Sequence, residues 1–281
     1  MTRLRISRRI FLADLGKGGV AAAVGIGLVA CGGGGEDGEG GDEEAPPTVA
    51  TDAPSTATEV PANSASGSNA VATPIAREAE GGAGSGLVAV QWERANLGLV
   101  SAYVLARGGE AAIVDTGVPD SEGTLEAALA ALGLGWDAVG HVIATHLHGD
   151  HVGSLPAVME AAAGATGYAG AADVSGISSP RELVALKDGD RVFDLDVIAT
   201  PGHTAGHISV LDSIGGILVA GDAINGAGGG VIGPNEQFTP DMVLANESVA
   251  RIAQLEFETI LFGHGEPVLS NGSAQVTALL S

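Results

Sequence analysis

Short apolar runs separated by glycine-rich turns make up the chain from Leu87 to Ser281. Runs of this length that are rich in valine, isoleucine and leucine predict strands. The predicted strands cover residues 87–92, 102–106, 111–115, 141–145, 192–200, 207–211, 217–220 and 259–262. The segment Arg107–Glu110 (R-G-G-E) has the composition of a tight hairpin turn between the second and third of these strands.

Helical spacing of apolar positions predicts three helices among these strands. The first has apolar residues at positions 125, 128, 129 and 132, with Ser121 as a candidate N-cap and Gly133 as a stop signal. The other two cover about 155–163, where Pro156 falls in the first turn, and about 240–255. Because two strand-rich halves each contain helices, we predict two packed sheets with the helices outside.

Residues 31–86 show no hydrophobic periodicity. Four glycines lead into an acidic run from Glu36 to Glu44, and a tract rich in Pro, Thr, Ser and Ala continues to about Thr73. Such a composition cannot bury enough apolar surface to offset the entropy lost on ordering. We therefore expect a disordered linker followed by a single domain at 87–281.

Residues 1–30 have the layout of an export signal. Ser7–Leu12 (S-R-R-I-F-L) resembles the core of a twin-arginine signal, and a weakly apolar stretch follows from Val20 to Ala30. A membrane-spanning helix is the alternative, but it needs about 20 apolar residues and this stretch is shorter. Leu28–Cys31 resembles a bacterial lipobox, so we expect the only cysteine, Cys31, to be lipidated rather than a free thiol. The expected location is the outer face of a bacterial membrane, as a cell-envelope lipoprotein.

The charge of the chain limits its partners. Residues 1–30 hold five of the 12 basic residues and one of the 34 acidic residues, which leaves a formal charge of −26 on the remainder. A chain of this charge is repelled by nucleic acid and by anionic lipid surfaces. We expect no nucleic-acid partner, and contact with a membrane only through a lipidated N-terminus. The oligomeric state stays open.

Histidines and aspartates gather just after predicted strands. Five of the seven histidines belong to one set of seven residues, four of which share the loop H-L-H-G-D-H. Imidazoles and carboxylates are costly to bury without partners, and a pair of divalent cations would supply them. Strand ends also deliver side chains to one rim of a rigid scaffold. The candidate metal ligands are His146, His148, Asp150, His151, His203, Asp222 and His264.

Residues 87–281 resemble the metallo-β-lactamase superfamily. The matching motifs are Thr145–His151 (T-H-L-H-G-D-H), Thr200–Thr204 (T-P-G-H-T), Gly221-Asp222 and Gly263–Gly265 (G-H-G), together with Asp115–Gly117 (D-T-G). The resemblance implies an α/β fold, a four-layer αββα sandwich, with its site at one edge of the two sheets.

The resemblance also implies how the ligands divide. One metal would lie on His146, His148 and His203, and the other on Asp150, His151 and His264. Asp222 would bridge the two metals, and Asp115 would orient the histidine loop. His207 matches no ligand position, and we expect it to pack or hydrogen-bond behind the ligands. Tyr168 could face the site as an oxyanion donor, but a half-buried strand tyrosine is the simpler interpretation.

The ligand chemistry predicts a hydrolytic centre. Two divalent ions contribute a charge of +4, and two aspartates with a bridging hydroxide contribute −3, so the centre would stay electrophilic at about +1. Nitrogen and oxygen ligands favour zinc, although manganese or iron would also fit. We expect the bridging hydroxide, oriented by Asp150, to attack an ester, lactone or thioester.

The substrate class has alternatives. The ligand set is most similar to those of glyoxalase II and quorum-quenching lactonases. Because only 17 residues follow His264 here, we expect the region by which glyoxalase II binds glutathione to be absent. Basic anchors are scarce near the motifs, with Lys187 and Arg191 the nearest candidates, so a neutral acyl compound is favoured over an anion. The loop 225–237 could cover it. A β-lactam hydrolase, a non-catalytic zinc-binding lipoprotein and a mononuclear-iron sulfur oxygenase stay open.

Overall fold

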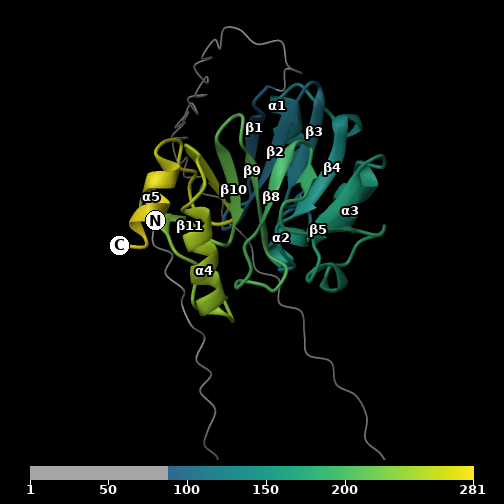
Figure 1. Ribbon diagram of the computed structural model, residues 1–281. Coiled ribbons are helices and arrows are strands. Elements are labelled where there is room, and N and C mark those ends of the chain that lie inside the picture. Colours follow the sequence, from purple (N-terminus) through teal and green to yellow (C-terminus); the bar gives the residue numbers. More distant parts are fainter. Residues whose placement is uncertain (1–87) are drawn as a thin grey trace, which may run out of the picture. The chain divides into compact units, whose positions relative to one another are not determined.

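The structure, a computed structural model, describes residues 88–281 (Figure 1). The expected export signal, the lipidation site Cys31 and the linker at 31–86 lie outside the described residues, so these stay predictions. Within the described residues, no helix combines the length and the apolar content needed to cross a membrane.

One sheet has six strands in the order β1-β2-β3-β4-β5-β6. The first three strands pair antiparallel, and β3 to β6 pair parallel. The strands are β1 (Gln91–Asn96), β2 (Ser101–Arg107), β3 (Glu110–Val114), β4 (Val139–Ala144), β5 (Thr166–Gly170) and β6 (Val184–Leu186). The parallel strands all end at the same edge of the sheet, which is where the side chains that follow them gather.

The other sheet has five strands in the order β13-β10-β9-β8-β7. In this sheet β10 and β13 are parallel, and β9 is antiparallel to both β8 and β10. The strands are β7 (Arg191–Val192), β8 (Leu195–Ala199), β9 (Ile208–Asp212), β10 (Ile217–Gly221) and β13 (Thr259–Phe262). A separate two-stranded hairpin consists of β11 (Asn225–Ala227) and β12 (Gly230–Ile232).

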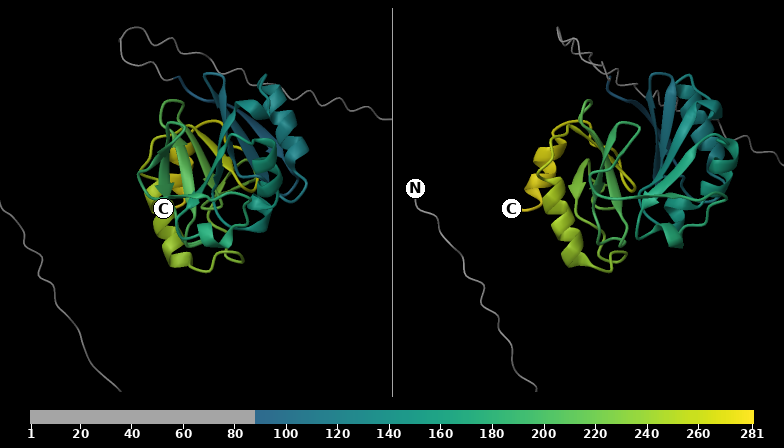
Figure 2. Two further views of the ribbon diagram at one scale, coloured as in Figure 1. Left: turned by 90° about the vertical axis from the view of Figure 1, so that its right-hand side faces the viewer. Right: turned by 45° about the vertical axis from the view of Figure 1, so that its right-hand side comes forward.

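The two sheets pack face to face, with helices on both outer faces (Figure 2). Helices α1 (Glu122–Ala131) and α3 (Leu155–Ala161) cover the six-stranded sheet, and α4 (Met242–Ile252) and α5 (Gly272–Ala278) cover the five-stranded sheet. The short helix α2 (Gly149–Val152) lies in the histidine loop. This arrangement confirms the predicted αββα sandwich.

Side chains along β2 point alternately to the two faces of the six-stranded sheet, and both faces are apolar. Ala102 and Val104 face α1 and α3, whereas Tyr103 and Leu105 face the other sheet. Because both faces are covered, a strand of this kind carries apolar residues at every position. A separate apolar cluster lies between the five-stranded sheet and the helices α4 and α5.

Several sequence-based boundaries were wrong. The first strand is an edge strand that begins four residues later than predicted and overlaps the apolar run at 87–92 only at Gln91 and Trp92, because an edge strand tolerates the polar residues of Gln91–Asn96. The predicted strand at 192–200 is two strands, because Phe193 and Asp194 both adopt positive φ and turn the chain between β7 and β8. Ser121 precedes α1 but its hydroxyl donates to the Val118 carbonyl, 2.6 Å away, instead of capping the helix.

Candidate metal centre

All the candidate ligands lie at one edge of the sandwich because of the direction of the strands that precede them. The strands β3 and β4 lead into Asp115 and His146, and β8, β10 and β13, which run in one direction, lead into His203, Asp222 and His264. Three groups of these side chains have ligand atoms within 4.8 Å of one another. The structure therefore brings together all seven residues that the sequence singled out.

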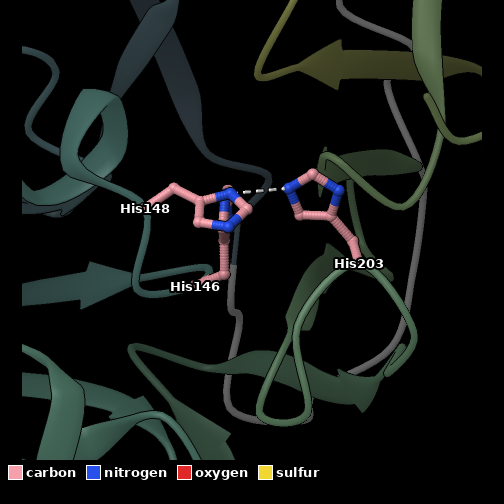
Figure 3. Close-up of side chains that lie close together, drawn as sticks. All are labelled: His146, His148 and His203. Carbon is pink, nitrogen blue, oxygen red and sulfur yellow. Dashed lines mark hydrogen bonds between the residues drawn. The ribbon is translucent and has the colours of Figure 1, made fainter. Parts of the chain in front are cut away.

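One group consists of His146, His148 and His203. The Nδ1 atom of His148 lies 3.1 Å from His146 Nε2 and 2.9 Å from His203 Nε2 (Figure 3). The other nitrogens of two of these rings have partners: Thr145 Oγ1 lies 3.0 Å from His146 Nδ1, and Thr239 Oγ1 lies 3.1 Å from His203 Nδ1. Because the Nδ1 atoms of His146 and His203 have these partners, their Nε2 atoms are free to face His148 Nδ1.

A neighbouring group consists of Asp150, His151 and His264. The Oδ2 atom of Asp150 lies 3.3 Å from His264 Nε2 and 3.9 Å from His151 Nε2. Asp222 lies between the two groups: its Oδ1 is 3.4 Å from His151 Nε2, and its Oδ2 is 3.4 Å from His203 Nε2 and 3.3 Å from His264 Nε2. One carboxylate therefore contacts histidines of both groups.

Hydrogen bonds from behind fix the orientation of the second group. The Nδ1 atom of His151 lies 2.8 Å from Asp115 Oδ2, and the Nδ1 atom of His264 lies 2.6 Å from the backbone carbonyl of Leu99. Asp115 also accepts from the backbone nitrogen of Thr145 at 2.7 Å and from its hydroxyl at 2.8 Å. Partners of this kind select the tautomer whose Nε2 lone pair can bind a cation.

His207 is buried next to the first group. Its Nε2 accepts a hydrogen bond from the backbone nitrogen of Asp222 at 3.0 Å, and its Nδ1 lies 2.8 Å from Thr200 Oγ1. Burial lowers the pKa of His207 to about 3, which keeps the ring neutral and able to accept. The ring thus fixes the backbone that carries Asp222.

The packing around Asp222 requires a glycine at position 263. A Cβ added to Gly263 would clash with Asp222 Oδ1 and would lie 2.6 Å from His151 Cε1. The G-H-G motif therefore has a steric reason in this structure, because the backbone of the His264 loop passes directly against two candidate ligands.

The electrostatics of the centre fit divalent cations. His151 Nε2 and Asp222 Oδ1 are buried and have no hydrogen-bond partner among the described residues, an arrangement that costs about 1–3 kcal/mol per group. Burial of the Asp222 carboxyl opposes ionisation, but His264 and the neighbouring histidines hold its pKa below the usual range. Hydrogen bonds to Asp150 and Asp222 raise the pKa of His264 to about 10. The carboxylates of Asp150 and Asp222 thus attract positive charge. In the metal-free protein a proton on His264 supplies this charge, and a bound cation could supply it instead.

The remaining histidine, His141, lies away from this centre. Its Nδ1 is 3.1 Å from the hydroxyl of Tyr168 on β5, and Phe193 packs against its ring. Tyr168 is half-buried against the apolar cluster between the sheets, so it is the strand tyrosine of the simpler interpretation and not an oxyanion donor.

Four contributors to the centre were missed by sequence reasoning. They are Thr239, the Leu99 carbonyl, Arg94 and Asp173. Arg94 on β1 donates to the Gly265 carbonyl at 3.2 Å and pairs with Glu266 at 2.7 Å, which holds the His264 loop. None of these residues belongs to a local motif, so only their spatial neighbours reveal them.

Comparison with known proteins decides the family. The family model described as the metallo-beta-lactamase superfamily matches residues 95–264, which is more than half of the chain. The chain belongs to the metallo-beta-lactamase superfamily. That range begins in β1 and ends at His264, so it contains both donor groups.

Relatives within the superfamily support a hydrolase. The chain is 32% identical over 200 residues to the probable metallo-hydrolase YflN of Bacillus subtilis, covering 56% of this chain and 75% of that protein. It is 35% identical over 144 residues to a hydroxyacylglutathione hydrolase of Pseudomonas fluorescens, covering 49% of this chain and only 50% of that enzyme. The crystal structure of TTHA1623 in a di-iron-bound form shares 25% identity and a TM-score of 0.52, covering 63% of this chain and 93% of that chain. The protein is therefore a metallo-hydrolase of the superfamily with glyoxalase II-like relatives.

Proposed function

We propose that the protein hydrolyses an ester, lactone or thioester at a centre of two divalent cations. The observation that carries this proposal is the position of Asp222, whose carboxylate contacts His151 and His264 on one side and His203 on the other. A storage or scavenging site gains nothing from a carboxylate shared between two ligand groups, whereas such a carboxylate would hold two cations close enough to act on one substrate.

The donor sets suggest which residues would hold each cation. His146, His148 and His203 would hold one, Asp150, His151 and His264 the other, and Asp222 would contact both. When bound, such cations polarise the substrate carbonyl and lower the pKa of water toward neutrality. Nitrogen and oxygen donors favour zinc, with iron and manganese as alternatives, and the di-iron form of TTHA1623 keeps iron in consideration.

Asp150 is the residue that we propose to orient the nucleophilic water. Its carboxylate is half-exposed at the centre, and its hydrogen bond with His264 lowers its pKa, so it is ionised at neutral pH. An ionised carboxylate at this position can accept a hydrogen bond from water and hold it toward a carbonyl carbon.

The substrate that we propose is an uncharged acyl compound. All five arginines of the described residues already contact carboxylates or backbone carbonyls, which leaves Lys187, beyond β6, as the one basic side chain without such a contact in that range. Two residues adjacent to the donor groups have exposed apolar side chains instead. Leu99 is 90% exposed beside His264, and Phe238 is 55% exposed next to Thr239, the partner of His203.

The cell-envelope location is a further part of the proposal. It rests on the twin-arginine and lipobox resemblances of residues 1–31. Membrane fractionation of cells expressing the full chain, with Cys31→Ala as the control, tests it: anchoring should be lost in the variant. Equal amounts of the two proteins in the membrane fraction would contradict lipidation at Cys31.

The test of the activity uses the purified full chain with known metal content. The substrates are an alkyl γ-lactone, an aryl ester, a glutathione thioester and a chromogenic cephalosporin. We expect hydrolysis of an uncharged acyl substrate that a chelator abolishes and that added zinc, iron or manganese restores. Undiminished turnover by metal-free protein would refute the mechanism, and metal binding with no turnover on any substrate would favour a non-catalytic role. Turnover of the cephalosporin alone would identify a β-lactam hydrolase instead.

A further inference from the structure

One buried carboxylate outside the proposed ligand set connects the two loops that form the first donor group. Asp173 follows β5 at the site edge of the six-stranded sheet and is 1% exposed. It forms no hydrogen bond with any of the seven candidate ligands, yet it accepts hydrogen bonds from residues adjacent to three of them. We propose that Asp173 is a positioning residue that sets the spacing between His203 and the His146–His148 pair, an inference that rests on the proposed two-cation function.

The contacts of Asp173 join segments from the two sheets. Its Oδ2 accepts from the backbone nitrogen of Leu147 at 3.1 Å and from the hydroxyl of Thr204 at 2.6 Å. Its Oδ1 accepts from the backbone nitrogen of Gly206 at 2.7 Å. Leu147 lies between His146 and His148, and Thr204 directly follows His203. A single carboxylate oxygen thus fixes both sides of the first donor group.

The second donor group has separate support. His151 is held by Asp115 and His264 by the Leu99 carbonyl, and Asp173 takes part in neither contact. Loss of the Asp173 carboxylate should therefore weaken cation binding by His146, His148 and His203 far more than binding by Asp150, His151 and His264. A merely structural role would weaken both groups alike.

The chemistry at position 173 requires a carboxylate. All three groups around it are donors, and an ionised carboxylate accepts at both oxygens. An asparagine can keep its oxygen on one side only, so its amide hydrogens would face either the Gly206 nitrogen or the Leu147 nitrogen and Thr204 hydroxyl. Asp173→Asn therefore removes at least one of the three hydrogen bonds with almost no change in volume.

The backbone at Gly206 packs closely against Asp173. A Cβ added to Gly206 would lie 2.6 Å from Asp173 Oδ1 and closer still to the Asp173 backbone nitrogen. Gly206→Ala should therefore separate the His203 loop from Asp173 by steric contact alone. It tests the same connection without any change of charge.

The experiment measures zinc affinity of the full chain in two backgrounds that each keep one donor group. His264→Ala keeps His146, His148 and His203, and His203→Ala keeps the other group. Zinc affinity is measured by competition with a chromophoric chelator. In the His264→Ala background, Asp173→Asn should lower zinc affinity by on the order of 10- to 100-fold. In the His203→Ala background the change should be less than about twofold.

Controls separate positioning from loss of fold. Thr204→Val in the His264→Ala background should reproduce part of the loss, and Thr204→Ser, which keeps the hydroxyl, should restore the affinity. Asp212→Asn removes an equally buried carboxylate that pairs with Arg107 at 2.7 Å at the other end of the sandwich, and it should leave zinc affinity unchanged in either background. Circular dichroism of each metal-free variant checks that it folds.

The possible failures are distinguishable. If neither single-group background binds zinc, the proposed two-cation function is wrong. If both bind zinc and Asp173→Asn changes neither affinity, or lowers both by the same factor, the positioning role of Asp173 is wrong while the proposed function stands.

Discussion

Replacing Asp115 with asparagine should weaken metal binding through the histidines that this residue orients. Asp115 adopts a left-handed backbone conformation, with φ of 62°, and asparagine tolerates that conformation better than other side chains with a Cβ. The substitution therefore leaves backbone strain almost unchanged and alters only the acceptor that faces Thr145 and His151.

The size of the effect follows from the hydrogen bonds at Asp115 Oδ2. That oxygen lies 2.8 Å from both Thr145 Oγ1 and His151 Nδ1. An amide nitrogen there would donate to His151 Nδ1 and move the ring proton to Nε2, which removes the lone pair that faces the centre. Each charge-assisted hydrogen bond contributes about 1.5–3 kcal/mol. A loss of this size, confined to one ligand, corresponds to roughly 10- to 100-fold weaker metal binding.

The assay is competition between the full chain and a chromophoric chelator for zinc, with the thermal unfolding of the metal-free proteins measured in parallel. Asp115→Ala adds about 1–2 kcal/mol of strain, so it should lower the unfolding temperature more than Asp115→Asn does. Asp212→Asn is the matched control, because it removes a buried carboxylate from the opposite end of the sandwich. Wild-type affinity in Asp115→Asn, or an equal loss in Asp212→Asn, would refute the orienting role.

Three more outcomes are expected. Chelation of the metals should lower the unfolding temperature by about 5–10 °C, because ligands that bind only the folded state stabilise it; equal melting curves with and without chelator would contradict a filled centre. Asp150 and Asp222 raise the pKa of His264 to about 10, so His264 is protonated in metal-free protein below that pH. Zinc binding at pH 8 should therefore release on the order of one proton into weak buffer, and zinc affinity should rise from pH 7 to 10. A zinc affinity that does not change with pH would contradict this. Phe238→Ala should raise KM for the best acyl substrate up to about tenfold with little change in kcat. Ile214→Ala, the control at an exposed apolar residue on the β9–β10 turn, should leave KM unchanged. Equal KM values for Phe238→Ala and the wild-type protein would exclude Phe238 from substrate contact.

The parts of the centre that the sequence predicted are those encoded by neighbours along the chain. His146, His148, Asp150 and His151 share one loop, and His203, Asp222 and His264 each lie within four residues of the end of a strand whose apolar run is visible. A strand end constrains where a side chain can lie, so the sequence alone predicts that these residues lie at one edge. The αββα layers followed from the same strands together with the resemblance of the motifs.

The parts that escaped prediction depend on contacts between distant segments. Asp173 is recognisable only by its donors, which lie 26 to 33 residues away. Leu99 acts through a backbone carbonyl on His264, 165 residues away, and any residue type presents such a carbonyl. The hairpin β11–β12 and the helix α5 carry too few apolar residues for a periodic signal, because each covers only a small part of the five-stranded sheet.

The distribution of ligands over the two sheets makes the sheet–sheet interface part of the centre. The loop after β4 supplies His146, His148, Asp150 and His151, whereas His203, Asp222 and His264 follow strands of the other sheet. Each donor group therefore combines residues from both sheets, and neither sheet could form either group alone. Direct hydrogen bonds cross the interface beside the ligands: Ile208 donates from its backbone nitrogen to the Thr145 carbonyl at 2.9 Å, and the Tyr103 hydroxyl donates to the Phe262 carbonyl at 2.9 Å. Since ligand placement must be accurate to a fraction of an ångström, the apolar packing between the sheets and these few crossing bonds should affect the metal affinity through the spacing that they set between the ligands.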